Sequence, residues 1–574
     1  MNTSSGSALF QTANDLANRN QWADAREAFE AALAQHPTNA EGHNQLGFVY
    51  AQLGDGGKAL RHFHQAFTLK PSLHEAFQNF GHLLTVLAEK NFTATIIKDN
   101  QAVLDLIARA KAAWPARVPA GELLSDPRFL ETAKNPYLLF YLGSTRLRDA
   151  EIEQMLTMLR AALLDLAPEQ TVDPHYLALT GAIACQCFAN EYVFSASAEE
   201  TKKVEALYKQ LAADLDTGAE IPAHRLAILA SYMPLHRLPN AAKLLSRAGD
   251  PGLQALLHQQ VEEVQQERKI RGELPQLTPI EDETSIKVRG QYEENPYPRW
   301  IATSTPERQI TFREYLTILF PHAQTRSFKD NVEVLFAGCG TGSVVAGFAQ
   351  LIANAKILAV DLSLSSLSYA KRMANQYRIR NVEFGQADIL QLPSLGRRFD
   401  IISSTGVMHH MAEPFHAWRT LVSMLNPGGF MHIGFYSEIA RKEVSEGWAY
   451  IKKHGYGKSA DEIRRFRQDV MALPDSEPMK RVLKSPDFYS TSDLRDLLFH
   501  EHELRVTIPQ IKQFLKENGL EFIGWDLPLE TRQLYAREFP IDAAMIELDN
   551  WQRFEEKYPR TFSQMYKFWV QKTA

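Results

Sequence analysis

Two different spacings of apolar residues divide the chain. In the first half, apolar residues recur every three or four positions, as in NPYLLFYL, DAEIEQMLTMLRAALLDL and PAHRLAILASYMPLHRL, and this spacing predicts packed helices. From Val332 onward, short apolar runs alternate with helical patterns such as SLSYAKRMANQY. The five runs are VEVLFA, KILAVD, VEFGQAD, FDIISST and FMHIGFY. Their alternation predicts a parallel, doubly wound sheet.

The C-terminal part extends the same pattern. The segment IPQIKQFLKENGL predicts a helix that stops at a glycine. LEFIGWDL and MYKFWVQK are of strand length, and we assign them as the last two strands of the same sheet. Residues 438–506 and 528–560 are then mostly helical insertions, and Gly272–Ser285 has the proline-rich, acidic composition of a linker.

An internal repeat with a period of about 34 residues covers the first part of the chain. Small and aromatic residues stand where two antiparallel helices must cross closely. These positions are Leu46, Gly47, Tyr50, Ala59, Phe63, Ala66 and Pro71 in one copy and Ala13, Leu16, Ala25, Phe29, Ala32 and Pro37 in the preceding one. The pattern resembles the tetratricopeptide repeat, with two full copies and a degenerate third. Such helix pairs bury their faces only by stacking, so the helices should continue beyond the repeats.

Composition excludes several classes of protein. A net charge of −6 over 574 residues argues against a general nucleic-acid-binding protein, and a local basic patch stays open. The three cysteines fit a reducing compartment. Cys185 and Cys187 lack a second ligand pair at zinc spacing, so we interpret them as core thiols and expect no metal site. With no signal peptide and no run long enough to span a membrane, we expect a cytoplasmic protein.

A glycine-rich loop follows the first predicted strand. Gly338-Cys339-Gly340-Thr341-Gly342 lets the backbone turn sharply and approach a ligand where a Cβ would collide. Nicotinamide-binding loops have glycine at the sixth position, whereas Ser343 stands here. Asp361 ends the second strand, where a carboxylate can accept both hydroxyls of a ribose; the alternative is that it caps the next helix.

The ordered motifs GCGTG, AVDLS, the acid after strand three, FDIISSTGVMHH and LNPGGFMHIGFY resemble those of class I S-adenosylmethionine-dependent methyltransferases. The whole chain resembles bacterial proteins that join tetratricopeptide repeats to this domain and share RGQYEENPYPRW before it. The segment DFYSTSDLRDLLFHEHE resembles the methyltransferase regulatory region of some bacterial protein-lysine methyltransferases.

The resemblance implies an α plus α/β chain: a helical repeat array, then a Rossmann-like seven-stranded class I methyltransferase domain with helical insertions. We predict repeats over 1–90, a helical middle domain over 91–285, the cofactor-binding core over 286–437, a helical or regulatory insertion over 438–506, and a C-terminal part over 507–574 that completes the sheet. The implied cofactor is S-adenosylmethionine. The residues expected to bind it are Gly338, Cys339, Gly340, Gly342, Asp361, Leu362, Asp388, Ile389, Thr405, Gly406 and Tyr292. Asp388 is expected to accept a hydrogen bond from the adenine amino group, and Leu362 and Ile389 are expected to pack on the two faces of the adenine ring.

Candidate catalytic residues are few, because the methyl group of a sulfonium is already activated and the protein mainly aligns the reactants. His409 and His410 follow the fourth strand, at the edge where open α/β sheets bind ligands, and either is a candidate base; the alternative is a helix-start residue. Tyr292 and Tyr297 are predicted to form a lid over the cofactor, with Tyr297 also a catalytic candidate. The alternative is an aromatic plug between the helical array and the sheet.

Tetratricopeptide repeats usually bind extended peptides, so we expect a protein acceptor, such as a lysine side chain. Two alternatives stay open: a small-molecule O-, N- or C-methyltransferase, and a non-catalytic scaffold that senses the cofactor. No nucleic acid or membrane partner is expected, and a homodimer is considered.

Overall fold

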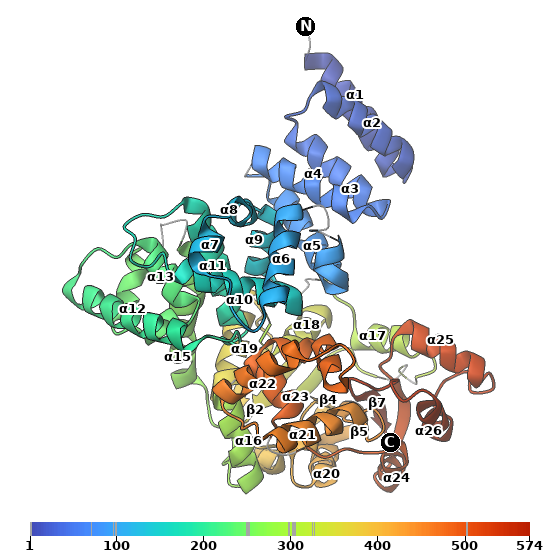
Figure 1. Ribbon diagram of the computed structural model, residues 1–574. Coiled ribbons are helices and arrows are strands. Elements are labelled where there is room, and N and C mark those ends of the chain that lie inside the picture. The colour runs from blue at the N-terminus through green and yellow to red at the C-terminus, as the bar shows by residue number, and fades with distance from the viewer. Residues whose placement is uncertain are drawn as a thin grey trace. The chain divides into compact units, whose positions relative to one another are not determined.

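The computed structural model describes residues 3–70, 72–95, 97, 100–247, 253–294, 296, 299–300, 303, 306–323, 325, 328–500 and 503–573 (Figure 1). The chain divides into two compact units. The first contains residues 1–190 and 196–256, and the second contains residues 191–195 and 257–574. Each unit is considered by itself, and the five-part division of the sequence stays a prediction.

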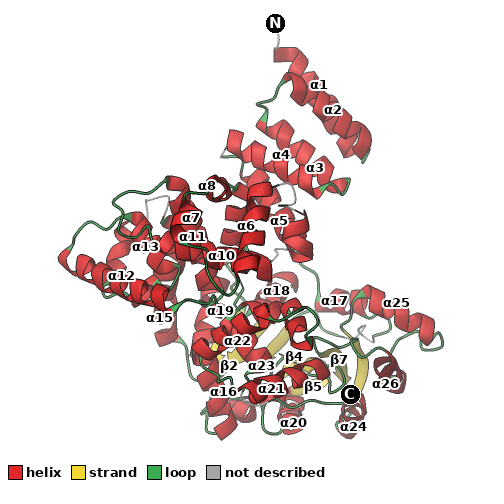
Figure 2. Cartoon of the chain, viewed as in Figure 1, coloured by secondary structure: helices red, strands yellow, loops and turns green. Residues whose placement is uncertain are grey.

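The described part of the first unit consists of helices, and the strands all belong to the second unit (Figure 2). Where the repeats were predicted, Ala25, Phe29 and Ala32 are fully buried. A Cβ on Gly47 would lie 2.7 Å from the Phe63 ring, so only glycine allows the helix that contains Gly47 to cross the helix that contains Phe63 so closely. Pro71, predicted to end a repeat helix, lies outside the described residues. The helices are α1 (Thr3–Asn18), α2 (Trp22–Gln35), α3 (Ala40–Gln52), α4 (Gly56–Leu69), α5 (His74–Thr95), α6 (Gln101–Ala113), α7 (Ala120–Leu124), α8 (Pro127–Ala133), α9 (Pro136–Ser144), α10 (Ala150–Leu164), α11 (Pro174–Ala189), α12 (Ala198–Thr217), α13 (Ala223–Ala230) and α14 (Gln254–Leu257), with the 3₁₀ helices η1 (Leu235–Arg237) and η2 (Ala241–Arg247).

The second unit is built on a seven-stranded sheet with the order β3-β2-β1-β4-β5-β7-β6. β1 to β5 are parallel, and β7 runs antiparallel to both of its neighbours, β5 and β6. All seven predicted runs are strands, so the predicted fold class is confirmed, including the two C-terminal strands. They are β1 (Val332–Ala337), β2 (Ala355–Asp361), β3 (Val382–Gln386), β4 (Phe399–Thr405), β5 (Leu425–Phe435), β6 (Leu520–Trp525) and β7 (Tyr566–Lys572).

Helices cover both faces of the sheet and form the insertions. The predicted C-terminal helix is α24, which begins with a capping box between Thr507 and Gln510. The helices are the π-helix η3 (His258–Glu262), α15 (Glu263–Glu273), α16 (Glu283–Glu294), α17 (Phe312–Leu319), α18 (Ser343–Leu351), α19 (Leu364–Gln376), η4 (Ile389–Leu395), η5 (Met408–His410), α20 (Pro414–Met424), α21 (Lys442–His454), α22 (Ala460–Ala472), η6 (Pro478–Lys484), η7 (Pro486–Tyr489), α23 (Thr491–Leu498), α24 (Ile508–Glu517), α25 (Leu529–Glu538) and α26 (Leu548–Lys557).

Each face of the sheet carries its own hydrophobic core. One core centres on Trp418 of α20, whose ring stacks on Phe514 of α24 with centroids 3.9 Å apart. The other includes Phe312 of α17 and Trp569 of β7. Strands buried on both faces explain why the sequence runs are continuously apolar instead of alternating.

The predicted linker lies along the outer edge of the sheet. Leu277 N donates to Gln386 O at 2.8 Å, and Gln386 N donates to Pro275 O at 2.9 Å, so this segment pairs with β3. The preceding helix α15 is tied to α19 by the buried Arg372, which pairs with Glu263 and Glu267. The linker composition therefore marks a segment that covers the edge of the sheet. No helix within the described ranges has the length and apolarity needed to cross a bilayer.

The core packing leads to a stability prediction. Trp418→Ala removes a fully buried ring and should lower the free energy of unfolding of the second unit by about 3–5 kcal/mol. The control is Ile541→Ala, because Ile541 is 99% exposed and its truncation should change stability by less than about 0.5 kcal/mol. Urea unfolding of the full chain, followed by circular dichroism, measures both. Equal effects of the two substitutions would contradict the packing described.

Candidate functional site

The glycine-rich loop joins β1 to α18 and requires glycine at both of its ends. Gly338 and Gly342 both have φ of 80°, in the left-handed region. A Cβ on Gly338 would lie 2.4 Å from Cγ2 of Val407, which follows β4. A Cβ on Gly342 would lie 2.8 Å from the Cβ of Ala370. The loop is therefore pressed between the residues after β4 and α19.

Asp361 at the end of β2 fastens this loop. One carboxylate oxygen accepts from Gly340 N at 2.8 Å, and the other accepts from Ser363 N at 2.9 Å. Ser363 is the residue that caps α19, since its hydroxyl accepts from Ser366 N, so the capping alternative for Asp361 is not what the structure has. Burial raises the pKa of Asp361, the two backbone amides lower it, and nearby Glu293 raises it. The side chain is only half-buried, and each oxygen keeps a second lone pair for a ligand.

Cys339 takes part in this loop through its backbone. Its N–H donates to Val360 O at 2.9 Å. Burial raises the pKa of the Cys339 thiol well above its usual value, so the group stays protonated and is a weak nucleophile. The contact predicted between Cys339 and the cofactor is therefore expected to involve its backbone and van der Waals packing, and not the chemistry of its thiol.

Asp388 has a buried carboxylate with one unused oxygen. Oδ1 accepts from Leu390 N at 3.0 Å and caps η4. Oδ2 has no hydrogen-bond partner among the described residues, although Asp388 is only 1% exposed. Its predicted neighbours lie close in the chain: Leu362 is half-buried after β2, and Ile389 is buried. An unsatisfied buried acceptor is costly, and an amino group of a ligand would relieve that cost.

Thr405 ends β4, and Gly406, His409 and His410 follow it beside the glycine loop. Thr405 and Gly406 are half-buried, whereas His409 and His410 are 0% and 3% exposed. The two Nε2 atoms are 3.1 Å apart. Burial lowers the pKa of His409 well below its usual value, and neighbouring His410 lowers it further, so His409 is neutral at pH 7.

The histidines belong to a larger buried polar cluster. His410 stacks on His500 with ring centroids 3.7 Å apart, and its Nε2 is 3.8 Å from Asp496 Oδ1. His409 packs on Tyr436 at 4.0 Å between centroids. Asp496 lies on α23, inside the predicted insertion. The structure thus brings a motif of the sheet together with residues that the sequence analysis had not selected.

Helix α16 joins this cluster to the cofactor side of the sheet. The Tyr292 hydroxyl donates to Asp496 Oδ1 at 2.7 Å, while the Tyr292 carbonyl accepts from the Ser363 hydroxyl at 3.0 Å. Glu293 accepts from Leu364 N at 2.6 Å, at the start of α19. Sequence analysis missed Glu293, because nothing in its local pattern distinguishes it from a surface acid. Tyr297, the other predicted lid residue, lies outside the described residues.

The residues present fit the adenosine end of S-adenosylmethionine. The glycine loop supplies the close backbone approach, Asp361 supplies free lone pairs at the end of β2, and Asp388 Oδ2 is a buried acceptor with no partner in the described part of the chain. All three lie after β1, β2 and β3, at the carboxyl edge where open sheets bind ligands.

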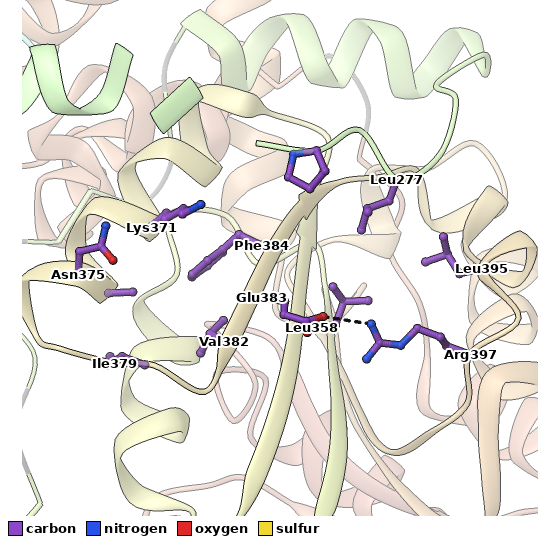
Figure 3. Close-up of a pocket in the computed structure, with 12 residues that line it drawn as sticks. Leu277, Leu358, Lys371, Asn375, Ile379, Val382, Glu383, Phe384, Leu395 and Arg397 are labelled. Carbon is purple, nitrogen blue, oxygen red and sulfur yellow. Dashed lines mark hydrogen bonds and ion pairs between the residues drawn. The ribbon is translucent and has the colours of Figure 1, made fainter. Parts of the chain in front are cut away.

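A separate pocket of about 450 Å³ lies on the outer side of the sheet (Figure 3). It is lined by Leu277, by Phe384 of β3, by Lys371 and Asn375 of α19, and by Arg397 before β4. Arg397 pairs with Glu383 at 3.2 Å on its rim, as Figure 3 shows. None of the predicted cofactor residues lines this pocket, so it is distinct from the site at the carboxyl edge.

Comparison with known families agrees with this site. Residues 328–468 match the methyltransferase domain family, and residues 13–54 match the tetratricopeptide repeat family. The first match contains the glycine loop, Asp361, Asp388 and both histidines.

Individual relatives are distant. Uncharacterized protein syc1184_c of Synechococcus is 25% identical over 285 residues, which are 48% of this chain and 68% of that protein. The ubiquinone/menaquinone biosynthesis C-methyltransferase UbiE of Vibrio vulnificus is 24% identical over 168 residues, 28% of this chain and 65% of that protein. Among solved structures, PKMT2 from Rickettsia typhi aligns with a TM-score of 0.36 and 18% identity, over 46% of this chain and 54% of that chain. The chain thus spans about two thirds of the length of the Synechococcus and Vibrio vulnificus proteins.

The glycine loop, the acid at the end of β2, the seven-stranded sheet and the two family matches lead to one conclusion. The chain carries a methyltransferase domain on a seven-stranded sheet together with N-terminal tetratricopeptide repeats, and the residues at the carboxyl edge of the sheet fit S-adenosylmethionine.

Proposed function

We propose that this protein transfers a methyl group from S-adenosylmethionine to a protein side chain, such as a lysine amine. The observation that carries the proposal is the arrangement of Asp361 and Asp388 around the glycine loop, in a chain whose residues 13–54 match the tetratricopeptide repeat family. When bound, S-adenosylmethionine supplies a methyl group on a positively charged sulfur, which makes the methyl carbon electrophilic.

The residues of the loop position the donor. We propose that Asp361 accepts the ribose hydroxyls, because its two oxygens are held in place by Gly340 N and Ser363 N. Asp388 Oδ2 accepts the adenine amino group, and Leu362 and Ile389 hold the ring. Gly338, Cys339, Gly342, Thr405 and Gly406 line the donor, and Tyr292 closes its side through α16.

The acceptor must lose one proton as it forms its bond to the methyl carbon and the bond from that carbon to sulfur breaks. We propose that His409 or His410 accepts this proton, since both residues follow β4 at the same edge of the sheet. His409 is neutral at pH 7, and a neutral imidazole has one nitrogen that can accept a proton. Both rings are buried, so the acceptor reaches them by displacing part of the covering cluster. Tyr297 remains a predicted lid and catalytic residue.

A protein acceptor is favoured by the repeats. Binding energy from parts of a substrate remote from the reacting atom can be used to orient that atom. A helical array that binds an extended peptide supplies such remote contacts. A homodimer and a cytoplasmic location stay predictions. The small-molecule and scaffold alternatives are distinguished by the experiments below.

The donor assignment is tested on Asp361. Asp361→Asn removes the charge while keeping the shape, and the dissociation constant for S-adenosylmethionine should rise about tenfold to a hundredfold, as expected for loss of charged hydrogen bonds worth about 1.5–3 kcal/mol. Asp461→Asn, on an exposed carboxylate of α22, should leave the constant unchanged. Isothermal titration calorimetry measures all three proteins. Wild-type binding that Asp361→Asn does not weaken would refute the assignment.

The acceptor class is tested by tritiated methyl transfer into a bacterial lysate, separated afterwards into protein and small-molecule fractions. We expect label in protein with the wild type and none above background with Asp361→Asn. Label only in the small-molecule fraction would replace the protein acceptor by a metabolite. Label in neither fraction, with S-adenosylmethionine bound, would favour a cofactor-sensing scaffold.

The histidines are tested by turnover on the labelled acceptor. His409→Ala and His410→Ala should each lower kcat by about 10²–10⁴-fold, as expected for loss of assistance at the proton. The affinity for S-adenosylmethionine should stay within about twofold of wild type, since neither ring is proposed to touch the donor. The exposed His416 on α20 gives the control, His416→Ala. Full activity of both variants would remove the histidines from the mechanism.

A further inference from the structure

The outer edge of the sheet is paired over only part of its length. β3 is the edge strand, and residues 275–277, which we call the edge segment, lie on its outer side. The edge segment pairs parallel to β3 at Gln386, where Leu277 N donates to Gln386 O and Gln386 N donates to Pro275 O. β3 begins four residues earlier, at Val382, so most of the strand extends beyond this pairing.

Two residues of β3 turn their backbone groups outward without a partner. In a parallel ladder, every second residue directs both its N–H and its C=O to the same neighbouring strand. Gln386 faces the edge segment, whereas Ala387 N donates to Asp361 O of β2. Phe384 and Val382, two and four residues before Gln386, therefore face outward as well. Neither makes a backbone hydrogen bond on that side with any residue that the structure describes.

A proline and a helix end prevent the edge segment from pairing further along β3. In the next position of the ladder, the donor to Phe384 O would be the N–H of Pro275, and proline has none. Leu274 N is used at the end of α15, where it donates to Ile270 O at 3.1 Å. The outward groups of Val382 and Phe384 thus form a short row that another strand can pair with.

The pocket of about 450 Å³ lies along this part of β3 (Figure 3). Its volume is within the range of about 300–1,000 Å³ that is usual for binding sites. Apolar side chains line it on both sides of the strand: Ala374, Ile379, Val382 and Phe384 on the side of α19, and Leu277, Leu358 and Leu395 on the other. A strand added at this edge would turn alternate side chains to these two sides.

The charges of the pocket distinguish its two sides. Arg397 on one side is paired with two acids, Glu383 at 3.2 Å and Glu333 at 3.6 Å. On the other side Lys371 is half-buried and makes no ion pair with any residue in the described ranges. Figure 3 shows Lys371 at the height of Phe384. Because paired residues of parallel strands point to the same face, an added residue opposite Phe384 would point to the side of Lys371.

We propose that an extended segment of a partner protein adds to the sheet along residues 382–384, with an acidic side chain against Lys371 and an apolar side chain against Leu277 and Leu395. The backbone of β3 supplies hydrogen bonds for affinity, and the two sides of the pocket supply specificity for alternate side chains. The surface is separate from the donor site, and its occupation requires neither S-adenosylmethionine nor methyl transfer. The inference therefore goes beyond the proposed function.

Binding of short peptides to the full chain tests the surface. Acetyl-Thr-Val-Leu-Glu-Thr-amide and the peptide of reversed order bring the glutamate to Lys371 in the two possible strand directions. Each carries a fluorescein label, and the protein is titrated while the fluorescence anisotropy is followed. One of them should bind saturably, with a dissociation constant on the order of 10⁻⁴ M, and the same peptide with glutamine for glutamate should bind more weakly. No saturable binding by either peptide would overturn the proposal.

Methylated peptides test whether the backbone of β3 is what binds. Successive N–H groups of a strand point to opposite edges, so methylation of alternate nitrogens blocks one edge only. One derivative of the bound peptide is methylated at the nitrogens of valine and glutamate, and the other at those of leucine and the second threonine. One derivative should bind at least about tenfold more weakly, and the other should bind within about twofold of the parent. Equal affinities of the two derivatives would contradict strand addition.

A charge exchange tests the role of Lys371. Lys371→Glu should weaken binding of the glutamate peptide at least about threefold, as expected for an ion pair at a partly exposed site. The variant should instead prefer a peptide with lysine in place of glutamate. Lys453→Glu, at an exposed position of α21, makes the same change outside the pocket and should bind the glutamate peptide as the wild type does. Circular dichroism shows whether the variant is folded, and Lys371→Gln replaces it if it is not. Unchanged binding by the folded variant would refute the assignment of Lys371.

Two other occupants of the edge would give different results. If a second copy of this chain covered it, sedimentation would show a wild-type dimer that Lys371→Glu separates, and neither peptide would bind. If a small carboxylate were the ligand, N-acetylglutamate would displace the labelled peptide as effectively as the unlabelled peptide does. Either result would overturn the proposal of an extended partner segment.

Discussion

The organisation of the carboxyl edge of the sheet depends on one carboxylate, that of Asp361. Its two oxygens hold Gly340 N in the loop after β1 and Ser363 N at the start of α19. The loop can lie there only because Gly338 leaves room for Val407 after β4. The ends of β1, β2 and β4 are thereby fixed relative to one another, and a small displacement at any of them would shift the site that positions the methyl donor.

Helix α16 extends this arrangement beyond the sheet. Through Tyr292 and Glu293 it binds the start of α19, and through the Tyr292 hydroxyl it binds Asp496 of α23. Arg495 of α23 pairs with Glu294 at 2.6 Å, which adds a second contact between these helices. The insertion is thus part of the site, because a single helix contacts both the cofactor side and the histidine cluster. A change in the position of α23 would be transmitted to the start of α19 through Tyr292.

The sequence predicted what depends on local pattern. Continuous apolar runs predicted all seven strands, and the spacing from Gly338 to Asp361 predicted that the glycine loop and this carboxylate lie together, because neighbouring parallel strands bring their carboxyl ends to one edge. It did not predict the partners of Tyr292, since Asp496 lies 204 residues further along the chain and no periodicity relates the two. The pairing of Leu277 with Gln386 was missed for a similar reason, since edge pairing uses backbone groups that every residue carries.

The difference between local sequence patterns and partners distant in the chain also applies to the buried polar cluster after β4. In the proposed function the donor is activated before it binds, so the residues proposed to hold it can be predicted from a compact set of motifs at the ends of β1, β2 and β3. The buried polar cluster beside this edge includes Asp496 and His500, which come from the insertion and not from the sheet. A sheet motif, His410, supplies only one of the three groups. The insertion at 438–506 therefore contributes the buried carboxylate of Asp496 to a cluster that the motifs of the sheet alone do not complete.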